Sequence, residues 1–167
     1  GFEVIHLNLG SSLSSAYQNC CTAARTLGHI YPVDSCNLST GTGLLVLQAG
    51  EMIREGLCAR EIQQNLIRMI PCSHASFVLD TLEFMRAGGR CSAVAAFGAN
   101  LLRLKPCIQV HPEKQGAMAV GKKYRGPMEK VLPAYIQDQL SAYSDFVPDH
   151  VFVTHSGISD DLLSLAC

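Results

Sequence analysis

The sequence predicts an α/β protein that begins with a parallel βαβ domain and continues into part of a second α/β domain with antiparallel strands. In the first half of the chain, short apolar runs alternate with segments of helical periodicity, and each helix opens directly after a strand. In the second half, two short apolar runs flank the six-residue turn His111-Pro112-Glu113-Lys114-Gln115-Gly116, a pattern typical of antiparallel strands. The parallel crossover should be right-handed.

The first half is expected to form two strands and three helices. Apolar residues recur at helical spacing from Leu13 to Leu27, and Gly28 ends that helix. Pro71 closes the last helix of this half. The expected ranges are strands 4–9 and 30–33 and helices 13–27, 44–55 and 59–69.

The second half is expected to contain more strands that pair antiparallel. Pro127 is a candidate first residue of a long helix, and Pro133 should kink that helix or reset its start. The expected ranges are strands 76–79, 107–110, 117–122 and 151–153, and helices 80–86, 93–104, 127–143 and one opening at 159–161. We place the domain boundary so that residues 1–73 form the first domain and residues 74–167 the second.

Composition narrows the classes of function. Hydrophobic residues make up 48% of the 167 residues, whereas charged residues make up 16%, against roughly 25% in typical globular proteins. Low charge indicates an apolar cavity or a surface that further chain covers. A net charge of −1 argues against a nucleic-acid partner, which normally requires a basic patch. No apolar run approaches the ~18 residues of a membrane span. Residues 1–5 are expected to be a strand already under way, with no signal peptide.

The eight cysteines do not have the spacing of a metal or redox site. No C-x-x-C pair occurs, so zinc and dithiol chemistry both lack their usual pattern. No pair of the six histidines has H-x-x-x-H spacing. We therefore expect no metal and no cofactor, and we expect mostly buried, reduced thiols in a cytoplasmic protein.

Two loops could carry chemistry. Ser11, Ser12, Ser14 and Ser15 lie at a strand-to-helix turn, where a helix N-terminus favours an anion, although plain N-capping by serine explains them as well. No G-x-S-x-G elbow is present, so a serine hydrolase is disfavoured. The loop at residues 39–43 contains two glycines without the spacing of a phosphate-binding loop, and close packing of a helix is the better explanation.

Several segments, in order along the chain, resemble motifs of the DegV family of fatty-acid-binding proteins. Leu13-Ser14-Ser15-Ala16-Tyr17-Gln18 resembles its L-S-G-T-Y-Q turn, and Val33-Asp34-Ser35 with Ser39-Thr40-Gly41-Thr42-Gly43-Leu44 resembles its V-D-S…S-x-G-x-G-L. Further matches are Asp80-Thr81-Leu82-Glu83-Phe84, Gly88-Gly89-Arg90-Cys91-Ser92, Gly98 to Pro106, Gly121 to Gly126 and His155-Ser156-Gly157. The resemblance covers the middle of a family member: the family's T-D-S-T strand, T-S-Q-P loop and H-x-G-x-G segment are not found in the sequence.

The resemblance implies a fold and a set of site residues. The DegV fold, of the EDD type, has a parallel α/β domain and a second α/β domain, with the lipid head group at the Ser turn and the tail in a tunnel between the domains. Ser14 is then a ligand of the lipid carboxylate, with Ser15 beside it in place of the family's glycine. Phe97, Leu101 and Leu102 are candidates for the tunnel wall. Arg125 matches the arginine by which the family engages a kinase, although Lys123 could substitute for it.

The resemblance also implies a function and partners. The protein would bind a long-chain fatty acid and present it to a separate ATP-dependent fatty-acid kinase, which forms acyl phosphate for phospholipid synthesis. It would not itself be an enzyme. An alternative is a small-molecule or phosphoryl-handling enzyme that uses the loops after the strands. Another is a scaffold without a ligand.

Overall fold

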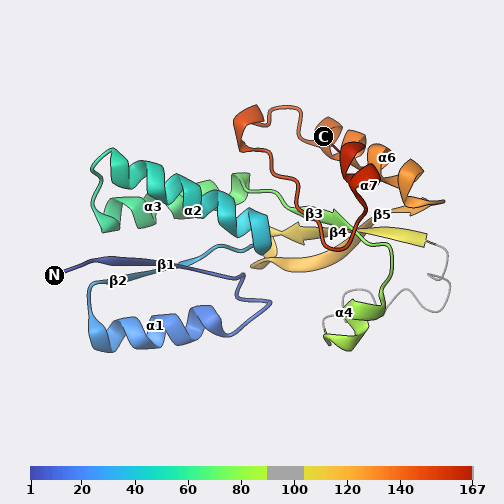
Figure 1. Cartoon of the computed structure of the whole chain (residues 1–167). Helices are drawn as coiled ribbons and strands as arrows, with labels where there is room; N and C mark the ends of the chain where they lie inside the picture. Colours follow the sequence, from blue (N-terminus) through green and yellow to red (C-terminus); the bar gives the residue numbers. More distant parts are fainter. Residues whose placement is uncertain (90–103, 167) are drawn as a thin grey trace. The chain divides into compact units, whose positions relative to one another are not determined.

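A computed structural model describes residues 1–89 and 104–166 (Figure 1). The chain divides into two compact units. The first unit comprises Gly1–Ala75 and Val110–Met118, and the second comprises Ser76–Gln109 and Ala119–Cys167. The first unit thus combines the N-terminal part of the chain with a hairpin tip formed by residues 110–118.

The first unit is built on two parallel strands. β1 (Val4–Asn8) pairs with β2 (Ile30–Asp34) in a register that runs from Val4 opposite Ile30 to Asn8 opposite Asp34. The connecting helix α1 (Ala16–Leu27) lies on one face of the strands, and two further helices lie on the other face (Figure 1). The predicted parallel βαβ arrangement is therefore confirmed.

The core of the first unit lies between the strands and the helices α2 (Ser39–Arg54) and α3 (Ala59–Met69). Its fully or nearly buried members are Val33, Leu45, Ala49, Met52, Ile62 and Leu66. Each large aliphatic side chain buried in this way contributes about 1.5–3 kcal/mol. Helix α3 begins with a capping box, because Cys58 N–H donates to Glu61 Oε2 at 2.9 Å. A 3-10 turn at Ile70–Cys72, with Pro71 inside it, ends the helical hairpin.

The second unit contains a three-stranded sheet in the order β3-β4-β5. Its elements are β3 (Ser76–Val78), α4 (Glu83–Ala87), β4 (Leu104–His111), a 3-10 turn (Pro112–Lys114), β5 (Ala117–Arg125), α6 (Met128–Ala142), a 3-10 turn (Pro148–His150) and α7 (Asp160–Ser164). β3 and β4 are antiparallel, with Phe77 opposite Ile108. The predicted antiparallel strands of the second α/β region are thus confirmed. The helix expected at 93–104 lies outside the described residues except for Leu104, which begins β4.

Helix α6 packs on this sheet through a small core of Cys107, Tyr124 and Val131, with Val78, Met128 and Tyr135 around it. Pro127 is the N-cap residue of the helix rather than its first helical residue. The helix runs through Pro133 without ending or restarting, so of the two effects expected of this proline, a kink or a new start, the new start does not occur. Val131 and Leu132, just before the proline, are buried, and this packing outweighs the one hydrogen bond that proline removes.

Three further expectations from the sequence were wrong. Helix α2 begins at Ser39, five residues before the expected Leu44, because tertiary contacts override the low helix propensity of its glycines. Residues 151–153 form no strand and are about half exposed, since they pair with no other strand in the described part of the chain.

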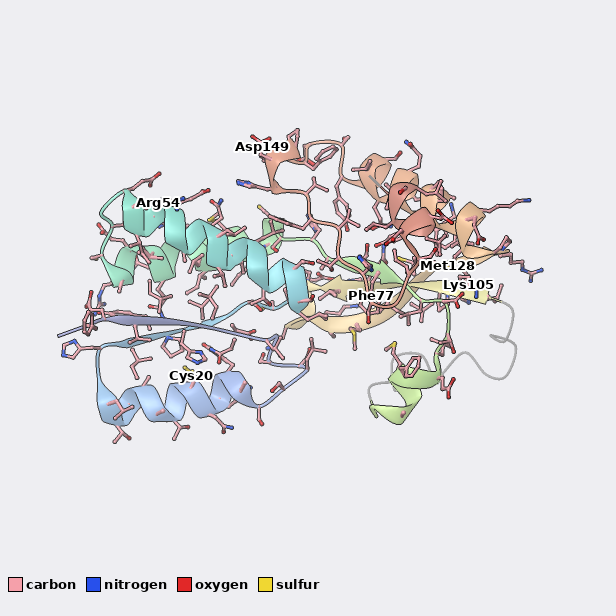
Figure 2. All side chains as sticks on the ribbon, in the orientation of Figure 1. Cys20, Arg54, Phe77, Lys105, Met128 and Asp149 are labelled. Atoms are coloured by element: carbon pink, nitrogen blue, oxygen red, sulfur yellow. The ribbon has the colours of Figure 1, made fainter. Side chains whose placement is uncertain are left out.

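The third concerns the thiols. Of the six described free cysteines only Cys107 is buried, whereas Cys58 and Cys72 are exposed. Helix α1 has no fully buried residue, so its adjacent Cys20 and Cys21 are half-buried. Figure 2 shows Cys20 on the side of α1 that faces the strands. No helix within the described ranges is both long and apolar enough to cross a membrane.

Candidate functional site

The serine-rich loop that joins β1 to α1, residues 10–15, is called the Ser turn below. It leaves the carboxyl end of β1, and Asp34 lies at the carboxyl end of the neighbouring parallel strand β2. Both strand ends therefore meet at one edge of the sheet, where open α/β folds bind ligands. Gly10 N–H donates to the carbonyl of Asn37 at 2.8 Å, and Leu13 N–H donates to the carbonyl of Gly10 at 2.8 Å.

Asp34 uses its carboxylate to hold two backbone segments. Ser11 N–H donates to Oδ1 at 3.1 Å and to Oδ2 at 3.3 Å. Cys36 N–H donates to the same Oδ1 at 2.9 Å. Hydrogen bonds to an ionised acceptor are about twice as strong as neutral ones. The carboxylate thus fastens the start of the Ser turn to the loop after β2.

The hairpin tip between β4 and β5 holds the Ser turn from a second direction. Ser12 donates both its N–H and its hydroxyl to the carbonyl of Gln115, at 3.2 and 2.9 Å. A Cβ on Gly10 would lie 2.7 Å from that same carbonyl oxygen. Only glycine therefore fits at position 10 without displacing the tip.

Beyond this doubly held segment, the Ser turn and the start of α1 leave donors free. Ser14 Oγ accepts from Ala16 N–H at 3.2 Å, which leaves the hydroxyl proton available to donate. Ser15 is the N-cap residue but makes no side-chain cap bond. In the part of the chain that the structure describes, the N–H groups of Ser14, Ser15, Tyr17 and Gln18 have no acceptor. A helix of 12 residues with free N–H groups at its start can bind an anion such as a carboxylate.

Two groups close to Asp34 stay neutral at ordinary pH. Burial, followed by the negative charge of Asp34, raises the pKa of the Cys36 thiol to about 11. Burial also raises the pKa of Tyr17, with smaller contributions from Cys21 and Asp34. Because the thiol stays protonated, Cys36 is a poor nucleophile here. Both groups are suited to packing and hydrogen bonding.

A buried polar cluster lies behind the loop that follows β2. Asn37 Nδ2 donates to the carbonyl of Ser73 at 2.8 Å, and Ser73 Oγ donates to the carbonyl of Gly41 at 2.9 Å. A Cβ on Gly41 would lie 2.2 Å from Asn37 Oδ1, which explains the first glycine of the 39–43 segment. A Cβ on Gly43 would meet nothing within 4 Å, so close packing accounts for only one of the two.

Sequence reasoning missed Asp34, Asn37 and Gln115 as contributors to this region. Asp34 directly follows an apolar strand, and that position could have indicated it. The carbonyl of Gln115 lies 103 positions after its partner Ser12 in the sequence. Because it is a backbone group, no side-chain pattern reveals it. Phe97, Leu101 and Leu102, the candidates for a lipid tunnel, lie outside the described residues.

Arg125 lies at the end of β5 in the second unit and is exposed. The neighbouring Tyr124 is buried, and its hydroxyl donates to Asp138 Oδ2 on α6 at 2.6 Å. Lys122 forms an ion pair with the same carboxylate at 2.5 Å. Because side chains alternate along a strand, Lys123 and Arg125 point to the face opposite Tyr124 and Lys122. The structure gives Arg125 no partner among the described residues.

The described residues contain no cluster of three or more His, Cys, Asp or Glu side chains that could hold a metal ion. The Ser turn offers backbone N–H groups and hydroxyls in place of carboxylate ligands. Its chemistry therefore suits an anionic ligand.

Comparisons with known proteins agree with one another. A sequence profile described as "Uncharacterised protein, DegV family" matches residues 1–166. A DegV domain-containing protein of Clostridium acetobutylicum is 34% identical over 128 residues, which cover 75% of this chain and 45% of that protein.

Solved structures have the same fold. A fatty-acid-binding protein described as DegV family from Thermus thermophilus superposes with a TM-score of 0.70 at 30% identity, covering 86% of this chain and 50% of that one. DegV, a fatty acid binding protein from Bacillus subtilis, superposes with a TM-score of 0.68 at 26% identity, with coverage of 86% and 50%. The chain thus spans about half the length of the relatives that it matches.

Proposed function

The chain belongs to the DegV family, and we propose that it binds a long-chain fatty acid, with the carboxylate held at the Ser turn. The hydrogen-bond donors at the start of α1 support this assignment. The Ser14 hydroxyl and the free N–H groups of Ser14, Ser15, Tyr17 and Gln18 meet at the first turn of α1. The related proteins from Thermus thermophilus and Bacillus subtilis are described as binding fatty acids, and this anion-binding geometry fits such a ligand.

Binding energies support a carrier that seldom releases its ligand into water. Each hydrogen bond to a charged group contributes about 1.5–3 kcal/mol. Burial of a C16 tail contributes roughly 12 kcal/mol before association costs, at about 0.8 kcal/mol per CH₂. Most of the affinity therefore comes from the tail. The Ser turn fixes which end of the molecule is presented and selects a carboxylate.

The second part of the proposal is delivery. The protein presents the bound fatty acid to a separate ATP-dependent fatty-acid kinase, which converts the carboxylate to an acyl phosphate, and it performs no catalysis itself. Arg125 is the residue proposed to contact that kinase. It is exposed and without a partner among the described residues, whereas the nearby Lys122 is already paired with Asp138. The planar guanidinium can form a bidentate pair with a carboxylate or phosphate on a partner.

Mass spectrometry of the ligand tests the proposal directly. Protein purified from a bacterial host is denatured and extracted with organic solvent, and the extract is analysed alongside an extract of an unrelated protein prepared in the same way. We expect a C14 to C18 fatty acid in a stoichiometric amount. Recovery of only a nucleotide or sugar phosphate would replace the carrier with a small-molecule enzyme. Recovery of neither would indicate a scaffold without a ligand.

A further inference from the structure

We propose that Asp34, together with the β4–β5 hairpin tip, positions the Ser turn so that the hydrogen-bond donors from Ser14 onward converge on the ligand carboxylate. The inference rests on the proposed function for the identity of the ligand. Its structural part, which is the fixing of the turn from two sides, can be tested without any ligand. Asp34 does not contact the fatty acid in this proposal, and it acts through the backbone of Ser11.

The N–H donors of this region fall into two groups. The N–H groups of Gly10, Ser11, Ser12 and Leu13 all donate to acceptors within the protein. The N–H groups that follow, from Ser14 to Gln18, are mostly left without acceptors in the described structure, and Ala16 N–H is taken by Ser14 Oγ. The protein thus supplies acceptors for the N–H groups of residues 10–13 and leaves the N–H groups that follow for a ligand. This division is typical of preorganised binding sites.

Asp34 brings a carboxylate close to the donors of the Ser turn. A carboxylate beside an anion-binding loop repels the ligand unless its own charge is used elsewhere. Here its two oxygens accept Ser11 N–H at 3.1 and 3.3 Å, and Oδ1 also accepts Cys36 N–H at 2.9 Å. Backbone donors therefore solvate the charge on the side of the loop that faces β2. Two charge-assisted bonds to segments 25 residues apart, Ser11 and Cys36, make the carboxylate a rigid link.

The hairpin tip also holds the loop. Its contact with the loop is backbone against backbone, because Ser12 N–H donates to the Gln115 carbonyl at 3.2 Å. Gly116 adopts a positive φ of 84°, and a Cβ there would lie 2.8 Å from the backbone carbon of Cys36. The tip thus touches both segments that Asp34 links. A substitution that moves the tip should disturb the Ser turn without touching a ligand donor.

The test compares three substitutions and measures fatty-acid affinity and thermal unfolding for each. Asp34→Ala removes both backbone links and should weaken fatty-acid binding by about tenfold, as expected for loss of a bond to a charged group. Asp34→Asn keeps Oδ1 as an acceptor for Ser11 and Cys36 and should restore affinity to within about threefold of the unsubstituted protein. Glu61→Ala is the matched control, since Glu61 also accepts a backbone N–H, from Cys58 at 2.9 Å, but at the start of α3. It should lower the melting temperature and leave affinity unchanged.

Hydrogen exchange separates this inference from the proposed function. In Asp34→Ala and in Gly116→Ala, the amides of residues 10–13 should exchange at least tenfold faster than in the unsubstituted protein, while those of α3 should not change. If the unsubstituted protein binds no fatty acid, but the Ser turn of the two variants loosens in this way, the proposed function fails and the positioning role stands. Unchanged exchange at residues 10–13, or equal affinity losses in Asp34→Ala, Asp34→Asn and Glu61→Ala, would overturn the positioning role.

Discussion

Both units of the molecule contain a cluster of hydrogen-bonded polar side chains, but the two clusters differ in what they leave unsatisfied. In the second unit, Ser76 Oγ donates to Gln139 Oε1 at 2.8 Å, so Tyr135 donates its own proton to Ser76 Oγ, also at 2.8 Å. Tyr124 and Lys122 both reach Asp138 on the same helix. Each of these donors has an acceptor within the cluster, and the result is a helix fastened to a sheet.

In the first unit, the Ser turn also consists of polar groups, but only the N–H groups of residues 10–13 have acceptors. Asp34 and the Gln115 carbonyl take the donors of Ser11 and Ser12. The donors that begin at Ser14 point to no acceptor in the described part of the protein. A cluster of hydrogen-bonded polar side chains is therefore not by itself a sign of a ligand site. The sign is a rigidly held loop whose last donors are free.

The largest expected effect is on the stability of the first unit. Gly41→Ala places a Cβ 2.2 Å from Asn37 Oδ1, so Asn37 must leave its hydrogen bonds, and the free energy of unfolding should fall by roughly 2–4 kcal/mol. Gly43→Ala, two positions along the same helix, meets nothing within 4 Å and should raise it by roughly 0.5–1 kcal/mol. Chemical denaturation of both variants measures the difference. Equal effects would mean that the cluster around Asn37 does not hold this loop.

Ser14→Ala should weaken fatty-acid binding by about tenfold, because a donor to a charged group contributes about 1.5–3 kcal/mol. Titration with a fluorescent fatty acid measures the affinity. Thr22→Ala is the control on the same helix, since Thr22 Oγ1 donates only to the carbonyl of Gln18 at 3.0 Å. A lower melting temperature with unchanged affinity would instead show that Ser14 only caps α1 through Ala16 N–H.

Tyr135→Phe should act on the second unit alone, with a loss of about 1 kcal/mol for one hydrogen bond and no change in fatty-acid affinity. Burial raises the pKa of Tyr135 from 10.0 to about 12. The folded state therefore holds this proton more tightly than the unfolded state, so its contribution to stability is complete below pH 10 and is lost as the pH rises toward 12.

Urea denaturation at pH 8, 10 and 11.5 checks the sign of this pH dependence. The unsubstituted protein should lose stability over that range, and Tyr135→Phe should lose less. Tyr124, whose pKa burial and Asp138 also raise, remains in the variant and should keep part of the slope. A steeper loss in Tyr135→Phe would contradict the assigned shift.

The smallest expected effect on the chain itself is that of Arg125→Ala. The side chain is exposed at the end of β5, so melting temperature and bound lipid should stay nearly unchanged. Acyl-phosphate production with the kinase should fall sharply, which a coupled assay measures. Lys123→Ala is the parallel variant on the same face of the strand. If turnover depends on Lys123 and not on Arg125, the kinase contact belongs to Lys123. Loss of lipid in Arg125→Ala would instead place Arg125 in the binding site.

The sequence alone was sufficient for the elements whose signals are local. Helix α3 was predicted with its observed limits, because its apolar positions recur at 3.6-residue spacing and Pro71 closes it. The start of α7 at residues 159–161 was also predicted, and Ser159 caps it, because Leu162 N–H donates to Ser159 Oγ at 3.3 Å. The segment at 151–153 was wrongly predicted as a strand, because propensity does not supply the neighbouring strand that a ladder requires.

The sequence by itself determined the α/β class, the order of most elements and the serine-rich turn at the end of β1, since periodicity and capping depend on residues a few positions apart. It could not determine how that turn is held. Ser11 depends on Asp34, 23 positions away, and Ser12 depends on the Gln115 carbonyl, 103 positions away. A backbone carbonyl has the same chemistry at every residue, so only the tertiary fold decides which one reaches the turn and which donors remain for a ligand.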